Sequence, residues 1–129
     1  MVETQYNNRC INNETDNKII DTEQFEEMRD LLEEDFVDLI QTYIIDSKQR
    51  IVLMQSAQKT NDNANGFEAA HALKGASINL GATQLVQLSE QLQEACRNRQ
   101  IDQQAALIGR ISAALEHTEY EINQRLGQL

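Results

Sequence analysis

The chain contains no proline and no tryptophan, and it has only five glycines in 129 residues. Proline and glycine are the residues that most disfavour a helix interior. Their scarcity, together with many Gln, Glu, Leu, Ile and Ala residues, favours helix over sheet. The length fits one domain with a core of its own.

Cysteine and long apolar runs are also scarce. Cys10 and Cys96 are the only two cysteines, so a disulfide framework is not expected. No apolar run approaches the length of a membrane span, and Met1 leads into polar residues rather than a signal peptide. We therefore expect a soluble, cytoplasmic protein without membrane contact. The net charge of −10 argues against nucleic acid as a partner.

Residues 1–18 are polar and rich in asparagine, and they predict a disordered tail ahead of a folded domain at 19–129. A short helix is expected to follow, ending near Leu32. Asp21 can cap this helix, Gln24 can return the hydrogen bond, and Ile20 can pack on Phe25.

Four longer helices are predicted from apolar residues that recur at steps of three and four. The first is expected at about 33–59, and the second from around Asn63 to Asn65, within the loop at 61–66, to Gly81. The third is expected at about 82–99, and the last follows Asp102, which is expected to cap it. The inner stripes are Phe36, Ile40, Tyr43, Ser47, Ile51 and Met54, widened by Val37, Ile44 and Ala57; Leu85, Leu88, Leu92, Ala95 and Cys96; and Ile108, Ile111, Leu115, Ile122 and Leu126. The short linkers predict an all-α, up-and-down antiparallel four-helix bundle with an additional short N-terminal helix.

The predicted helix that ends at Gly81 has an unusual polar face. Helical spacing places His71, Lys74, Gly75 and Ile78 on that face, whereas Phe67, Ala70, Leu73, Ser77 and Leu80 fall on the buried side. Glycine inside a helix costs about 0.5–1 kcal/mol relative to alanine. Gly75 therefore suggests that a partner needs clearance to reach the imidazole. Ser77 is expected to bond back along its own helix.

The sequence pattern H-x-L-K-G-x-S-x-x-x-G-A, from His71 to Ala82, resembles the signature of histidine-containing phosphotransfer (HPt) domains. The resemblance covers roughly residues 20–127. It implies that His71 carries a phosphoryl group on its solvent-facing ring nitrogen, because a neutral imidazole has a free lone pair at cytoplasmic pH. Lys74, one turn along, can place its ammonium beside the phosphoryl oxygens. By the same resemblance, Gln93 would hydrogen-bond the phosphoryl group or the imidazole, and Arg97 would add positive potential.

The resemblance also implies the partners. The protein would accept phosphoryl from the aspartyl phosphate of a receiver domain, or from a sensor kinase, and pass it to the receiver of a response regulator. Receivers of hybrid histidine kinases are included. We expect a monomer that docks them through apolar residues around His71, with Ile78, Val86 and parts of the helix at about 33–59 as candidates.

We expect no cofactor in this chain, because Mg²⁺ would belong to the receiver partner. The chain has no Walker A loop, no Gly-rich nucleotide lid and no acidic metal site of the kinase type. It is therefore expected to be a phosphoryl carrier rather than an enzyme, with no kinase activity of its own.

Two other classes of protein compete with this interpretation. Glu68 and His71 form one Glu-x-x-His unit, and di-iron bundles use two such units. Three residues before His117 the chain has Ala114 instead of a glutamate, so it supplies too few ligands for a di-iron site. His117 is then an ordinary surface histidine. A non-catalytic helical adaptor is the remaining alternative, although an adaptor has no need for a histidine with clearance. Met1 and the polar tail favour a free-standing protein over a fragment of a larger kinase.

Overall fold

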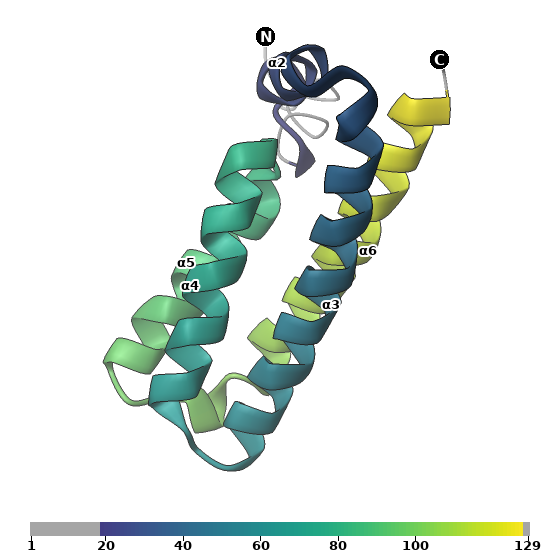
Figure 1. Ribbon diagram of the computed structural model, residues 1–129. Coiled ribbons are helices and arrows are strands. Elements are labelled where there is room, and N and C mark those ends of the chain that lie inside the picture. Colours follow the sequence, from purple (N-terminus) through teal and green to yellow (C-terminus); the bar gives the residue numbers. More distant parts are fainter. Residues whose placement is uncertain (1–18, 128–129) are drawn as a thin grey trace, which may run out of the picture.

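The computed structural model describes residues 19–127, and within them the chain is helical without strands. The helices are α2 (Thr22–Leu32), α3 (Phe36–Lys59), α4 (Asn63–Leu80), α5 (Thr83–Arg97) and α6 (Ala105–Gly127), with 3₁₀ turns η1 (Glu33–Asp35) and η2 (Ile101–Gln103). Helices α3 to α6 run alternately up and down, and α2 lies across one end of them (Figure 1). The predicted all-α bundle with a short N-terminal helix is confirmed, and the predicted tail at 1–18 lies outside the described residues.

The core lies between the predicted apolar stripes. Helix α3 contacts α4 and α6, and α5 contacts the same two helices. The buried side chains include Phe36, Ile40, Tyr43, Ile51 and Met54 of α3, Leu85, Leu88, Leu92 and Cys96 of α5, and Ile108, Ile111, Leu115 and Ile122 of α6. Val37 was expected to widen the first stripe, but it is 46% exposed. It lies about 100° around the helix from Phe36, outside the face that the neighbouring helices cover.

Three predicted helix boundaries differ from the structure. Helix α3 begins at Phe36, because residues 33–35 form η1 and Glu33 turns the chain with a φ of 51°. Helix α5 ends at Arg97 rather than Arg99. Asp102 does not cap the last helix: it lies in η2, where its carbonyl accepts a hydrogen bond from the Gln58 amide at 2.8 Å. This turn places Ile101 in the core, and α6 begins only afterwards.

Helix α2 is fixed to the end of the bundle by its own N-terminus. The Asp21 carboxylate caps it, accepting from the backbone N–H groups of Glu23 and Gln24 at 3.1 and 3.3 Å. The predicted return bond from Gln24 was wrong, because the Gln24 amide instead donates to the Asn79 carbonyl at 2.9 Å. The Asp21 N–H donates to the Gly81 carbonyl at 2.7 Å. These bonds join α2 to the turn that follows α4.

Gly81 is required at this turn for two reasons. Its φ of 82° is left-handed, as in a glycine that ends a helix. A Cβ at this position would also lie 3.0 Å from the Cβ of Gln24, so α2 could not approach as closely. The glycine of the signature therefore both ends α4 and admits α2.

One buried polar contact fixes α4 against α3 beneath the polar face of α4. The hydroxyls of Tyr43 and Ser77 are 2.7 Å apart and both are buried. Burial raises the pKa of Tyr43 to about 12, so the phenol stays protonated at neutral pH. Ser77 was expected to bond along its own helix, but the Tyr43 hydroxyl reaches it from α3 and is its partner. The contact holds α4 in one rotation about its axis.

Candidate functional site

His71 lies on the outward face of α4. Asp62 caps this helix by accepting from the Asn65 N–H at 3.0 Å. Ala70 and Leu73, which lie roughly 100° and 160° around the helix from His71, are fully buried, so the imidazole points away from the core. His71 and Gly75 are exposed, as the spacing predicts.

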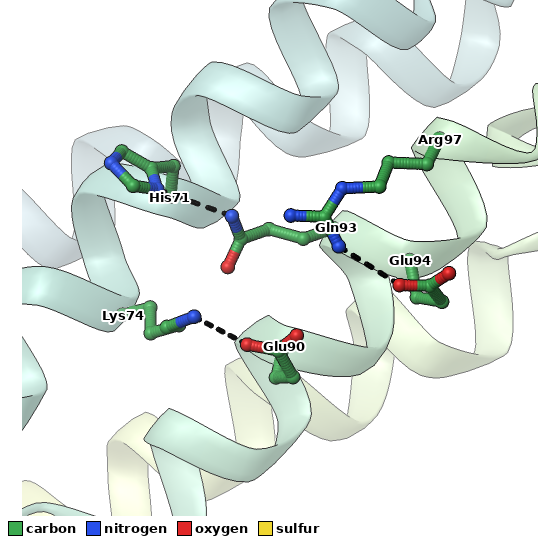
Figure 2. Close-up of polar contacts among 6 residues, drawn as sticks. All are labelled: His71, Lys74, Glu90, Gln93, Glu94 and Arg97. Atoms are coloured by element: carbon green, nitrogen blue, oxygen red, sulfur yellow. Dashed lines mark hydrogen bonds and ion pairs between the residues drawn. The ribbon is translucent and has the colours of Figure 1, made fainter.

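Gln93 of α5 contacts one ring nitrogen of His71. Its amide nitrogen lies 3.1 Å from Nδ1 of the imidazole, and its side chain is only 1% exposed. Figure 2 shows the other ring nitrogen on the side of the imidazole away from Gln93. The amide oxygen of Gln93 is buried and has no hydrogen-bond partner. The contact therefore orients the imidazole and leaves Nε2 facing outward.

The two cations near His71 are both paired with glutamates of α5. The Lys74 ammonium donates to the Glu90 carboxylate across the α4–α5 interface, and the Arg97 guanidinium donates to Glu94 at 2.9 Å (Figure 2). Lys74 holds the pKa of Glu90 below its ordinary value, through the hydrogen bond first and its charge second. Neither cation is bonded to the imidazole.

Phe67 connects Arg97 to the histidine. Its ring stacks on the imidazole with centroids 6.0 Å apart and an angle of 8° between the planes. The Arg97 guanidinium carbon lies 5.2 Å from the Phe67 centroid, within the range of a cation–π contact. Phe67 thus contributes to the site, whereas its spacing predicted a core residue. It stands one turn before His71, which is the sequence signal for this contact.

These contacts follow one antiparallel register of α4 and α5. Phe67 meets Arg97, His71 meets Gln93, and Lys74 meets Glu90, with steps of three and four residues running in opposite directions on the two helices. The next step of this register places Ile78 opposite Val86. Ile78 is 50% exposed and Val86 is half-buried, so both reach the surface on the side of His71 toward the turn.

Other possible functional groups in the described part of the chain are isolated. No cluster of three or more His, Cys, Asp or Glu side chains within residues 19–127 could hold a metal ion. His117 is exposed on α6, beside Arg110 and Tyr120, and no hydrogen bond orients it. Cys96 is a buried free thiol, and Cys10 lies outside the described residues. Across the same residues, no helix combines the length and apolar character that crossing a bilayer requires.

Fold and site together define a four-helix bundle that presents one oriented histidine on its surface. The sequence model of the Hpt domain family matches residues 38–121, well over half of the chain. The chain therefore belongs to the Hpt domain family. This membership supports a histidine phosphotransfer function in phosphorelays, in which members of the family interact with receiver domains and are in general phosphoryl carriers rather than kinases.

A solved structure shares the fold. The crystal structure of histidine-containing phosphotransfer protein B from Pseudomonas aeruginosa PAO1 superposes with a TM-score of 0.81. The match covers 86% of this chain and 96% of that one, at 22% sequence identity. No curated protein sequence matches the chain.

Proposed function

We propose that this protein carries phosphoryl groups on His71. It accepts them from the phospho-aspartate of a receiver domain, or from a sensor kinase, and passes them to the receiver of a response regulator. The observation that carries the proposal is the setting of His71, an exposed imidazole with one ring nitrogen held by a buried glutamine and the other facing outward.

The chemistry requires a nucleophile that also leaves readily. In acceptance, the Nε2 lone pair of His71 attacks the phosphorus of the aspartyl phosphate. The N–P bond forms as the O–P bond breaks, and the electron pair of that bond stays on the aspartate carboxylate. Delivery to the next receiver is the same exchange in reverse. In this proposal Mg²⁺ is bound by the receiver and this chain supplies no cofactor.

Gln93 sets which nitrogen can attack. A neutral imidazole has one N–H and one lone pair, so a free lone pair on Nε2 requires the proton on Nδ1. In the structure the Gln93 amide nitrogen faces Nδ1, an arrangement that suits the tautomer with the proton on Nε2. Half a turn of the amide brings its unpaired oxygen to Nδ1, where it accepts a hydrogen bond from Nδ1–H and so favours the tautomer whose Nε2 lone pair is free. We take this flipped orientation of Gln93 as the one that supports transfer.

A Gln93→Leu variant is expected to accept phosphoryl from a phospho-receiver about five- to tenfold more slowly, because a lost hydrogen bond of about 1 kcal/mol no longer favours the reactive tautomer. The imidazole ¹⁵N shifts should change with it. Gln91→Leu, at an exposed position of the same helix, is the matched control and should transfer at the wild-type rate. Equal rates for the two variants would remove Gln93 from the mechanism.

A Lys74→Ala variant is expected to retain the phosphoryl acceptor but to lose the cation one helical turn away from it. Transfer should slow, or the phosphohistidine should hydrolyse faster, by about fivefold, which corresponds to about 1 kcal/mol for a partly exposed charge. Arg97→Ala should give a smaller effect in the same direction, since its guanidinium lies on Phe67 and Glu94. Lys48→Ala, at an exposed lysine paired with Glu119, is the control. An unchanged transfer rate and an unchanged phosphohistidine lifetime in Lys74→Ala would show that Lys74 is only a solvated side chain.

The test of the whole proposal is incubation with a ³²P-labelled phospho-receiver, followed by acid treatment of the protein. We expect acid-labile, base-stable label on this chain, as a phosphohistidine gives. With Mg·ATP alone we expect no label, since a carrier has no kinase activity. Label that survives acid, or label from ATP without a partner, would contradict the proposal.

A further inference from the structure

The cluster around His71 is electrically balanced. Lys74 and Arg97 bring two positive charges, and Glu90 and Glu94 bring two negative ones directly against them (Figure 2). A phosphoryl group adds between one and a half and two negative charges at neutral pH, roughly as it does on other side chains. The phosphoryl group must therefore compete with carboxylates for cations that are already paired.

The Lys74–Glu90 pair is the stronger competitor of the two. It joins two helices, whereas the Arg97–Glu94 pair lies within one helix. The side chains of Lys74 and Glu90 are 27% and 48% exposed, and those of Arg97 and Glu94 are 50% and 59% exposed. The α4–α5 register places Glu90 one step from Gln93, toward the turn, where its carboxylate contacts Lys74. Glu90 is ionised at neutral pH like any exposed glutamate, and the Lys74 hydrogen bond lowers the pKa of its carboxyl group further.

Resting on the phosphotransfer function above, we propose that Glu90 is a counter-ion that weakens the hold of the site on the phosphoryl group and so keeps it transferable. Glu90 draws the Lys74 ammonium away from the phosphoryl oxygens and repels their charge. A phosphohistidine beside free cations would be more stable and a poorer donor. Glu90 is thus a positioning residue, acting through Lys74, and Glu94 acts in the same way on Arg97 with less effect.

The substitution Glu90→Gln tests this role with little change in shape. The amide oxygen of glutamine can still accept from Lys74, but the negative charge is gone. The matched control is Glu119→Gln, which removes one charge from another exposed lysine–glutamate pair, Lys48–Glu119 at 3.6 Å between α3 and α6. Both pairs lie near the surface, where ion pairs contribute little to folding, so neither variant should change the thermal midpoint appreciably.

The proteins are loaded with phosphoramidate, which needs no partner protein. The Nε2 lone pair of His71 attacks phosphorus, the N–P bond of the reagent breaks, and ammonia leaves. The half-life of the phosphohistidine is then followed by ³¹P NMR. We expect Glu90→Gln to lengthen it by about two- to tenfold at low salt, Glu94→Gln by less, and Glu119→Gln not at all. High salt should reduce the difference, because it screens exposed charges.

A second measurement separates a counter-ion from a group that activates water. The equilibrium of phosphoryl exchange with a receiver domain should shift toward the phosphohistidine in Glu90→Gln by a similar factor. A longer half-life with an unchanged equilibrium would mean that Glu90 acts on the attacking water, and the proposal would fail. It would also fail if Glu119→Gln matched Glu90→Gln, since net charge would then explain both.

These outcomes are distinct from failure of the phosphotransfer function. If no receiver exchanged phosphoryl with the wild-type protein, the proposed function would be lost. The half-lives after phosphoramidate loading would still decide whether Glu90 destabilises the phosphohistidine, because that comparison involves no receiver. An equal half-life in wild type and Glu90→Gln would overturn the inference even if transfer from a receiver proceeded normally.

Discussion

A His71→Gln variant is expected to accept no phosphoryl group from any phospho-receiver while keeping its helical circular dichroism and its thermal midpoint. The loss is complete because glutamine has no ring nitrogen that can form the N–P bond. The fold is unaffected because the imidazole is exposed on α4, and exposed substitutions usually change the free energy of unfolding by less than about 0.5 kcal/mol. The measurements are label transfer from a ³²P-labelled receiver and a thermal melt.

His117→Gln is the control for this experiment. His117 is the only other histidine in the sequence, and it is exposed on α6 without a hydrogen bond that orients it. It should transfer at the wild-type rate. If His71→Gln still took up label and His117→Gln did not, the phosphoryl acceptor would be His117 on α6. That result would contradict the role proposed for His71.

The helical bundle could be predicted because its signals are local and repeated. Apolar residues such as Ile40, Tyr43 and Ile51 recur at helical steps over many turns, and each is buried. The ends of the helices could be predicted less well. Glu33 takes a positive φ without being glycine, and Ile101 enters the core from a 3₁₀ turn. Both depend on what the rest of the chain packs against them, and no local pattern in the sequence marks either.

The site could be predicted on α4 and only in part on α5. The spacing of His71, Lys74 and Gly75 lies within one helix, and the structure places these residues on one face as expected. The α5 residues depend on how two helices are aligned, which spacing within a helix does not fix. The structure shows that residues at equal distances along the chain from Ala82 face each other, as Lys74 and Glu90 do.

This register was available from the sequence. A turn as short as Gly81–Ala82 forces α4 and α5 to be antiparallel neighbours, so counting outward from it pairs the residues of the two helices. Such a count would have named Glu90 as the partner of Lys74. It would not have given the burial of Gln93, which depends on the side chains around it.

Gly75 gives the sharpest test of an accessible histidine. A Cβ built at this position meets no atom within 4 Å, and the residue is exposed in the middle of α4. Gly75→Ala is therefore expected to stabilise the fold by up to about 1 kcal/mol, as alanine does at an open helical site. A single methyl group leaves the imidazole reachable, so phosphotransfer should change little. This variant is the control for a larger side chain at the same position.

A Gly75→Gln variant is expected to remain as stable as wild type or more so, and yet to lose phosphotransfer by at least about a hundredfold. Side chains on a helix lean toward its N-terminus, so a long side chain at position 75 lies over His71, four residues earlier. It would block a receiver that must bring its aspartate to within bonding distance of Nε2, and displacements of about 1 Å can cost that much in rate. The measurements are the thermal midpoint and the transfer rate from one phospho-receiver.

The two readouts together separate access from folding. A stable Gly75→Gln variant that transfers at the wild-type rate would show that no partner approaches over this face of α4. A variant that unfolds would place Gly75 in a helix contact, against the open space around it. Phosphoramidate is small enough to reach Nε2 past the glutamine side chain, so it should still load His71 in the variant. Loading by phosphoramidate without transfer from the receiver would assign the loss to docking, because the nucleophile itself would be intact.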